Sequence, residues 1–276
     1  MNQTQKSNNV HYKIIGEGTP IVLLHGWSLN HQHMESTFEP IFEQRQGWRR
    51  IYPDLPGHGK TPGQDWIQNQ DQMLEVILEF INEVVGEERL IVGGVSAGGY
   101  LARGVLYHKQ KSIDGLLLVV PLMVAEDEKR SLPLHTVIVE DQELISGLSG
   151  VEGDVLGMAV VQSQKLLNRL RSEPELLKEA GDAEFRALIR ENPERYAFSF
   201  DVDNLSKPFD GPTLIITGKQ DAFAGYRDAW RLVENYPRGT FAVLDRAGHL
   251  LELEQEDLFS SLVSEWLDRV EEYVKK

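Results

Sequence analysis

The most constraining feature of the sequence is the stretch GGVSAGGYLARG, residues 93–104, in which one serine stands between pairs of glycines. It directly follows the apolar run Leu90–Val92, which predicts a strand that turns at once into a helix. On so tight a bend, the residues two before and two after the serine crowd together and must be small. Gly94 and Gly98 occupy these positions around Ser96. The stretch predicts a serine hydroxyl held at the head of a helix, where negative charge is favoured.

Short apolar runs alternate with helical patterns along most of the chain. The runs expected to form strands are bounded by Gly, Pro or Asp; they are Val10–Ile15, Ile21–Leu24, Arg50–Tyr52, Leu90–Gly93, Leu116–Val120, Thr213–Thr217 and Thr240–Leu244. Helices are expected at residues 31–46, 66–85, 97–109, 226–236 and 255–273. This alternation predicts an α/β fold with a mostly parallel, doubly wound sheet and helices on both faces.

One long interval, from Pro121 to Gly211, contains no convincing strand. Its helical patterns are DQELISGLSG, MAVVQSQKLLNRL, PELLKEA and DAEFRALIRENPERYAF. We expect residues 122–207 to form an inserted helical cap over the carboxyl edge of the sheet, where ligands bind in open α/β folds. The core domain is then expected to comprise residues 1–121 and 208–276.

Two further residues are candidates for the partners that a serine nucleophile requires. A serine nucleophile needs a base that accepts its proton, and the base needs a carboxylate that orients it. His249 follows the last predicted strand in AVLDRAGHLLELEQ, and Asp221 follows the strand before it in IITGKQDAFAG. Ser96, Asp221 and His249 therefore stand in this chain order, each just past the carboxyl end of a strand. The placement predicts a catalytic triad of the Ser–His–Asp kind.

Two backbone N–H groups are candidates for an oxyanion hole, which tetrahedral intermediates of acyl transfer require. One belongs to Ala97, immediately after the serine. IVLLHGWSLN supplies the other, because Gly26 permits a tight turn after the strand that aims the Trp27 N–H inward.

The pieces LLHGW, YPDLPGHGKTP, GGVSAGGYLA, TGKQDAFAG and DRAGHLLELEQ resemble the α/β-hydrolase fold family over essentially the whole chain. The resemblance implies that Ser96 is the nucleophile, His249 the general base and then acid, and Asp221 the orienting acid. Backbone N–H groups of Trp27 and Ala97 would stabilise the oxyanion, and the insertion would be the family's cap. It also implies that the protein uses no cofactor and no metal ion.

Two departures from the family pattern accompany this resemblance. The acid loop DAFAG lacks the proline often found a few residues after the aspartate. The polar stretch NQTQKSNN is unlike the family's usual first strand, so the sheet is expected to begin one strand late. In this family, the histidine equivalent to His25 shapes the oxyanion loop, and we expect that role here and not that of a base.

Alternatives stay open for the acid and for the function. Asp127 follows the strand at residues 116–120, where some members of the fold carry the acid, whereas Asp245 is expected in a solvated turn. The favoured function is a serine hydrolase (an esterase) that cleaves a small carboxylic ester or a related acyl bond through an acyl-enzyme. The alternative is a receptor or sensor for a small ligand, built on the same fold, with slow turnover or none.

Other motifs favour structural roles. GHGKT, residues 57–61, ends like a phosphate-binding loop, but that motif requires a glycine where Asp54 stands. We expect a loop near the mouth of the site, with Asp54, Pro56 and Gly57 as turn residues.

Three polar side chains are expected on the surface. His31 and His33 stand too close in sequence to chelate a metal from one helix face, and Arg103 is expected on a solvated helix face. Side chains that fit either an acyl pocket or the core are Trp27, Leu29, Tyr100, Met123, Met158 and Trp230.

Charge and composition exclude several classes of binding partner and several kinds of site. The 28 Lys and Arg residues against 43 Asp and Glu residues give a net charge of −15, which argues against nucleic acid and anionic membrane surfaces. The absence of cysteine excludes disulfides, thiolate zinc sites and a cysteine nucleophile. A polar N-terminus and an apolar stretch too short to span a bilayer predict a cytoplasmic protein. The partner expected for the favoured function is a small-molecule substrate. The sequence leaves the oligomeric state open.

Overall fold

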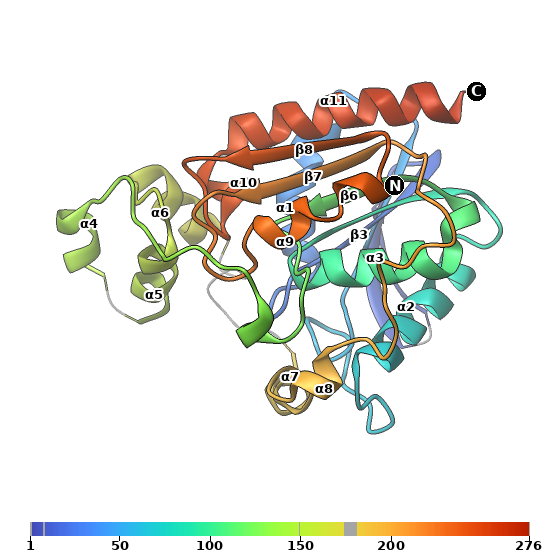
Figure 1. The fold of residues 1–276 in the computed structure, drawn as a ribbon, viewed down its shortest axis with the longest axis horizontal. Helices are drawn as coiled ribbons and strands as arrows, with labels where there is room; N and C mark the ends of the chain where they lie inside the picture. Colours follow the sequence, from blue (N-terminus) through green and yellow to red (C-terminus); the bar gives the residue numbers. More distant parts are fainter. Residues whose placement is uncertain (1, 8, 149, 174–180, 276) are drawn as a thin grey trace.

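The chain forms a sheet flanked by helices on both faces (Figure 1). The computed structural model describes residues 2–7, 9–148, 150–173 and 181–275. Over these ranges, the strands are β1 (Asn2–Ser7), β2 (Val10–Ile15), β3 (Thr19–Leu24), β4 (Trp48–Pro53), β5 (Leu90–Val95), β6 (Ile113–Val119), β7 (Thr213–Gly218) and β8 (Gly239–Leu244). Their order in the sheet is β1-β2-β4-β3-β5-β6-β7-β8. Every neighbouring pair from β4 to β8 is parallel, so the prediction of a mostly parallel sheet is confirmed.

The N-terminal segment corrects one expectation, because β1 is a strand. It pairs antiparallel with β2, from Asn2 opposite Ile15 to Ser7 opposite Val10. A polar sequence can pair at a sheet edge because the ladder bonds come from the backbone. Asn9, at the turn between the two strands, has a φ of 66°, a left-handed conformation that asparagine tolerates better than most residues. The sheet therefore does not begin one strand late.

The helices divide between the two faces of the sheet. They are α1 (His31–Phe42), α2 (Gln70–Val84), α3 (Ala97–Lys109), α4 (Gln142–Ser146), α5 (Gly150–Met158), α6 (Gln164–Ser172), α7 (Ala183–Arg190), α8 (Pro193–Tyr196), α9 (Arg227–Trp230), α10 (Leu251–Glu254) and α11 (Glu256–Val274). Short 3-10 turns lie at Gln110–Ser112, Asp127–Lys129 and Val233–Asn235. Figure 1 shows α11 on one side of the strands and α2 and α3 on the other. None of the helices in the described ranges is long and apolar enough to cross a membrane.

The alternation of side chains along each central strand explains why helices cover both faces of the sheet. In β3, Val22 and Leu24 belong to the buried cluster that α2 and α3 cover, whereas Ile21 and Leu23 belong to the cluster beneath α1 and α11. Successive side chains of a strand point to opposite faces, so an uninterrupted apolar run needs a helix on each side. The carboxyl ends of the parallel strands are thereby fixed along one edge of the sheet.

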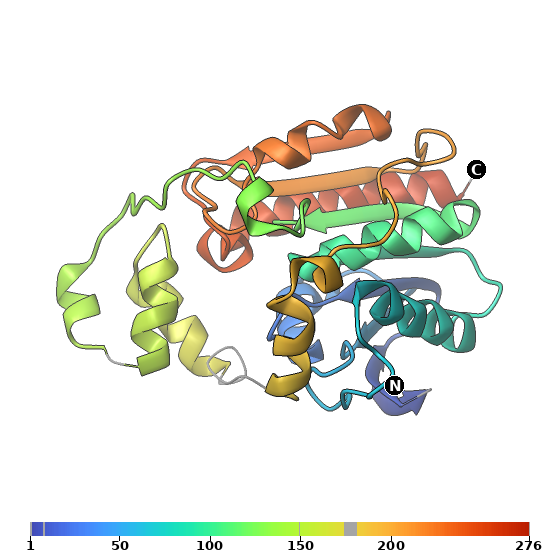
Figure 2. The same cartoon turned by 60° about the horizontal axis from the view of Figure 1, so that its bottom comes forward.

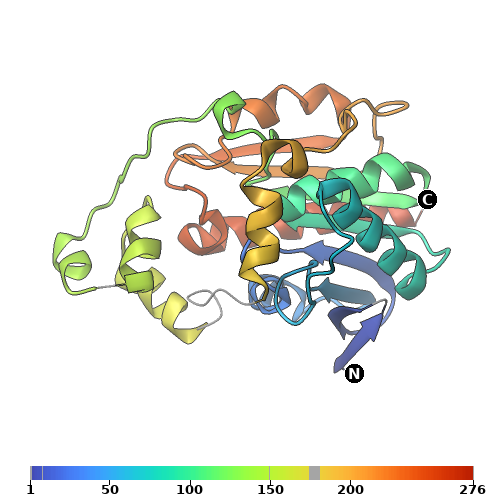
Figure 3. The ribbon, with the colours of Figure 1, turned by 90° about the horizontal axis from the view of Figure 1, so that it is seen from below.

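The interval between β6 and β7 is helical, and it falls into two parts. Helices α4–α6 share a small apolar cluster that includes Leu156, Leu167 and Leu253, while Phe185 and Tyr196 of α7 and α8 belong to the main core. Figures 2 and 3 show α4–α6 set off to one side of the sheet, with α7 and α8 closer to it. The pattern PELLKEA, residues 174–180, lies outside the described residues.

Arg103 is not on a solvated helix face, so that expectation is wrong. Its side chain is buried, donates from Nε to Asp203 at 3.1 Å and from NH1 to the carbonyl of Leu122 at 3.1 Å. The helix face that carries Arg103 is covered by a segment about a hundred residues later in the chain, which local periodicity does not reveal. The guanidinium therefore ties α3 to the chain after β6 and to the segment before β7.

Candidate active site

Ser96 stands on the bend between β5 and α3, in a conformation that most residues avoid. Its φ is 53° and its ψ is −117°. Such a backbone costs on the order of 1–3 kcal/mol and persists only where its surroundings impose it. A Cβ at Gly94 would lie 2.2 Å from the carbonyl of Gly98, and a Cβ at Gly98 would lie 2.2 Å from the carbonyl oxygen of Leu24. The close backbone packing on both sides of Ser96 therefore requires glycine at both positions.

Ser96, His249 and Asp221 lie in one line of hydrogen bonds. The Ser96 hydroxyl lies 2.9 Å from Nε2 of His249, and Nδ1 of His249 lies 2.9 Å from Oδ2 of Asp221. A carboxylate only accepts, so Nδ1 carries the ring proton and Nε2 is left to accept from the hydroxyl. Asp221 is fully buried, and its other oxygen accepts from the backbone N–H groups of Phe223 and Ala224 at 2.8 and 3.0 Å. These bonds fix the carboxylate in place.

The electrostatics of the pair favour a charged acid and a basic imidazole. Burial raises the pKa of Asp221, but His249 and the two backbone donors outweigh it, so the pKa lies below its usual value. Burial likewise lowers the pKa of His249, but the charge and hydrogen bond of Asp221 outweigh this effect and the net pKa is raised. The raised pKa makes the neutral imidazole a stronger base than a free histidine.

A tight turn after β3 lies beside the serine. Leu29 N–H donates to the carbonyl of Gly26 at 3.2 Å, and Ser28 takes the positive φ of 65° that such a turn needs. A Cβ at Gly26 would lie 3.4 Å from the Cβ of Ser96, so the turn packs directly against it. The N–H of Trp27 lies inside the turn and that of Ala97 is first in α3, positions whose N–H groups have no partner within their own element. Their role as oxyanion donors stays a prediction.

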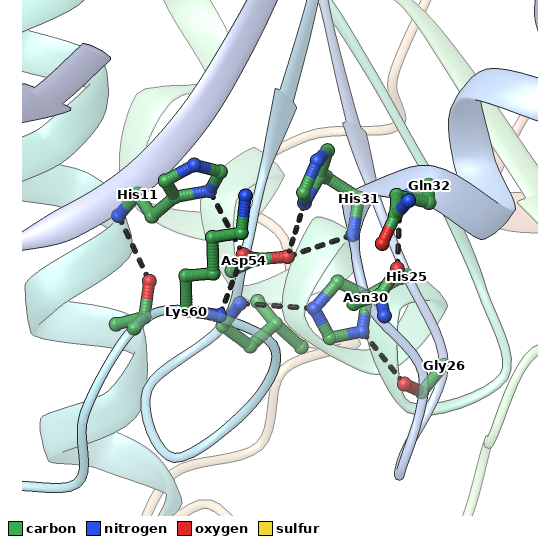
Figure 4. Close-up of polar contacts among 10 residues, drawn as sticks. His11, His25, Gly26, Asn30, His31, Gln32, Asp54 and Lys60 are labelled. Carbon is green, nitrogen blue, oxygen red and sulfur yellow. Dashed lines mark hydrogen bonds and ion pairs between the residues drawn. The ribbon is translucent and has the colours of Figure 1, made fainter. Parts of the chain in front are cut away.

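His25 is hydrogen-bonded to this turn (Figure 4). Its Nδ1–H donates to the carbonyl of Gly26 at 2.7 Å, and its Nε2 accepts from the backbone N–H of Leu55 at 3.0 Å. Burial lowers the pKa of His25 to about 4, so the ring is neutral over the physiological range. With both ring nitrogens occupied, His25 positions the turn and has no free nitrogen to act as a base.

Asp54 and His31 correct two expectations, because both are buried partners in one network (Figure 4). Oδ1 of Asp54 accepts from the backbone and Nδ1 of His31 at 2.7 and 2.9 Å. Oδ2 accepts from Nδ1 of His11 and from the backbone of Lys60, each at 2.9 Å. Burial raises the pKa of Asp54, but these donors overcome it and bring the pKa down to about 2. Asp54 thus joins β2, α1 and the loop after β4 and is more than a turn residue.

The cluster of His11, His31 and Asp54 also has the donor types of a metal site, with one ligand atom from each residue within 4.8 Å of the others. Each carboxylate oxygen already accepts two N–H groups, however, and both Nδ1 atoms donate to it. A metal ion would have to displace these bonds. The arrangement is therefore better described as a hydrogen-bonded hub.

A cavity of about 290 Å³ opens onto Ser96 and His249, and its wall is mainly apolar. The lining residues are Gly26, Trp27, Leu29, His33, Val95, Ser96, Leu122, Arg130, Val155, Met158, Leu170, Arg190, Tyr196, Phe223, Ala224, His249, Leu250, Glu252 and Leu253. Three of the side chains considered for a pocket, Trp27, Leu29 and Met158, line it. The other three do not: Tyr100 and Met123 lie in the core, and Trp230 is exposed.

The structure also gives the positions of the two rival aspartates, Asp127 and Asp245, and of His33. Asp127 is exposed and pairs with Arg130 and Arg190, so it is not the carboxylate that contacts His249. Asp245 is exposed, as expected. His33 is buried and lines the cavity, against the expectation of a surface residue.

Comparisons with known proteins agree with this geometry. The model of the alpha/beta hydrolase family matches residues 21–262. The chain belongs to the alpha/beta hydrolase family. The predictions of this family, of its fold and of an enzyme are confirmed.

Several known proteins resemble this alpha/beta hydrolase over nearly its whole length. A structure of an alpha/beta superfamily hydrolase from Oenococcus oeni PSU-1 superposes with a TM-score of 0.86 at 29% identity, covering 98% of this chain and 99% of the other. A pimeloyl-[acyl-carrier protein] methyl ester esterase of Legionella pneumophila (strain Corby) is 21% identical, covering 94% and 99%. A 2-hydroxy-6-oxononadienedioate/2-hydroxy-6-oxononatrienedioate hydrolase of Burkholderia vietnamiensis is 23% identical, covering 94% and 91%.

Local sequence patterns in this alpha/beta hydrolase do not indicate the polar part of the cavity wall. Arg130, Arg190 and Glu252 all line the cavity, and each lies in a segment whose local pattern is that of an ordinary charged surface. Glu252 is the exception, because its position three residues after His249 already suggests that it lies near the site.

The elbow can be tested through its glycines. We expect Gly98→Ala to lower the free energy of unfolding by about 2–4 kcal/mol, because its Cβ would meet backbone that cannot move away. Gly157→Ala is the matched control: this glycine is exposed in α5, an added Cβ there would have no neighbour within 4 Å, and alanine should add about 0.5–1 kcal/mol. Urea unfolding of both variants measures the difference, and equal stabilities would contradict the packing described for Ser96.

Proposed function

We propose that this chain is a serine hydrolase that cleaves small carboxylic esters through an acyl-enzyme. The observation that carries the proposal is the line of hydrogen bonds from Ser96 through His249 to the buried Asp221, with Ser96 and His249 at the wall of a mainly apolar cavity. A strained serine, a correctly protonated imidazole and a fixed carboxylate together form the arrangement that activates a hydroxyl for attack on a carbonyl.

In the proposed reaction, Oγ of Ser96 attacks the ester carbonyl while Nε2 of His249 takes its proton. The backbone N–H groups of Trp27 and Ala97 stabilise the oxyanion that forms. His249 then gives the proton to the departing alcohol, which leaves an acyl group on Ser96. Water, deprotonated by the same histidine, attacks this acyl-enzyme; His249 returns the proton to Oγ of Ser96 as the acid is released, which restores the starting state. Asp221 remains ionised throughout and holds the imidazolium that forms at each stage.

We further propose that residues 122–207 act as the cap of a core domain made of residues 1–121 and 208–276. The helices of this interval contribute Val155, Met158, Leu170, Arg190 and Tyr196 to the cavity wall. As part of the wall around the proposed nucleophile, they would exclude water and select the substrate.

The size of the cavity and the relatives favour small esters. About 290 Å³ is at the small end of the volumes that hold small-molecule ligands. The similar proteins include an esterase named for a methyl ester and a hydrolase named for a dienedioate, and the apolar wall suits the acyl chain of the first kind of substrate.

Turnover of short p-nitrophenyl esters tests the proposal. The wild-type protein should hydrolyse the acetate or butyrate ester over many cycles, and Ser96→Ala should lower kcat by about 10⁴-fold or more, because the triad acts as a unit. Full activity in Ser96→Ala would contradict the assignment. Release of one equivalent of p-nitrophenol and then arrest would instead favour a receptor that cleaves its ligand once.

The acid assignment predicts a pH profile. His249 must be deprotonated to act, and its pKa is raised above the usual 6.5, so kcat/KM should rise with pH through a midpoint above 6.5. Asp221→Asn should move this midpoint to lower pH and reduce kcat by about 10³–10⁴-fold, since it removes the charge and favours the wrong tautomer. Asp127→Asn should leave the midpoint in place and cost less than about tenfold. The reverse pattern would assign the acid to Asp127.

A further inference from the structure

A histidine and a glutamate face each other in the wall of the cavity. His33 belongs to α1 and Glu252 to α10, and Nε2 of His33 lies 3.2 Å from Oε1 of Glu252. Their side chains are only 2% and 3% exposed. Both line the same cavity as Ser96 and His249. The reaction proposed above uses neither of them.

The buried pair of His33 and Glu252 lowers the stability of the fold. Oε2 of Glu252 and both ring nitrogens of His33 make no hydrogen bond to any residue in the described ranges, so even the 3.2 Å approach lacks hydrogen-bond alignment. The wall of the cavity that they line is mainly apolar. Buried polar atoms without partners destabilise a fold, and apolar side chains of similar volume in place of a buried pair are often as stable or more stable. Stability therefore does not account for the pair.

The charges around the cavity indicate what the pair can bind. Arg130 and Arg190 also line the cavity, so a cationic substrate group is disfavoured there. A carboxylate next to Glu252 would be repelled by it. The ring nitrogens of His33 and Oε2 of Glu252 each expose less than 1 Å² in this structure, so a substrate group must enter between the two side chains to reach them. A hydroxyl is small and neutral, and in that position it can donate to the carboxylate of Glu252 while it accepts from a ring N–H of His33. A hydroxyl therefore satisfies both members of the pair at once.

We propose that His33 and Glu252 form a hydroxyl-recognition subsite, and that the natural substrate is an ester with a hydroxyl on its acyl or its alcohol part. This inference rests on the proposed function and specifies its substrate class. The subsite lies close to the reacting groups, because Glu252 follows His249 by three residues and His33 lines the same cavity as Ser96. The pair would thus bind the substrate within reach of Ser96.

Three esters test the subsite: ethyl butyrate as the reference, ethyl 3-hydroxybutyrate with an acyl hydroxyl, and 2-hydroxyethyl butyrate with an alcohol hydroxyl. Hydrolysis is followed by pH-stat titration. For the wild-type protein, kcat/KM of one hydroxy ester should exceed that of ethyl butyrate by about tenfold or more, as expected for a hydrogen bond to a charged group. In Glu252→Leu and in His33→Leu, this ratio should fall toward 1. Because each ratio is taken within one variant, a general loss of activity does not disturb it.

Two controls separate recognition from structure. Glu256→Leu makes the same change just beyond α10, at a side chain that is 41% exposed and pairs with Lys165, and it should keep the wild-type ratio. The double variant His33→Leu, Glu252→Leu should unfold at the same urea concentration as the wild type or a higher one. Hydrolysis that depends on Ser96 with the same ratios in the wild type and both leucine variants would overturn the subsite and leave the proposed function standing. A wild-type protein that hydrolyses none of the three esters would overturn both.

Discussion

The bend at Ser96 is the constraint on which the rest of the site depends. A serine held at a φ of 53° is unfavourable by itself, and it persists because Gly94 and Gly98 let β5, α3 and the end of β3 approach at backbone distance. The same approach brings the turn at Gly26 against the serine. One close contact between backbones thus places the hydroxyl beside the turn whose N–H group is proposed to stabilise an oxyanion.

The other parts of the site stay in place through buried groups that are fully paired. Asp221 is held by two backbone donors and His249, Asp54 by four donors, and His25 by one bond at each ring nitrogen. Paired in this way, buried polar groups make their loops rigid. His33 and Glu252 are the contrast, because they are buried in the cavity wall with atoms that have no partner in the described structure. Rigid loops around a pair that lacks hydrogen-bond partners suit a site in which the substrate supplies those partners.

The sequence predicted what depends on local pattern and missed what depends on distant partners. The apolar runs placed the central strands, and the order of Ser96, Asp221 and His249 after strand ends anticipated their contact. It missed β1, because edge pairing through the backbone leaves no apolar signature. It also misplaced Arg103, His31 and His33 on the surface, since each is buried by a partner from another part of the chain. Those partners are Asp203, Asp54 and Glu252.

The central claim is that Ser96 is activated by His249, and a fluorophosphonate probe tests it most directly, because the probe reacts with an activated serine whatever the natural substrate. Intact-protein mass spectrometry should show one label per chain, and peptide mapping should place it on Ser96. Ser96→Ala should remain unlabelled, and His249→Ala should react at least about a hundredfold more slowly, as expected when the general base is lost. A folded wild-type protein that takes up no label, or a Ser96→Ala variant labelled as fast as the wild type, would contradict the account.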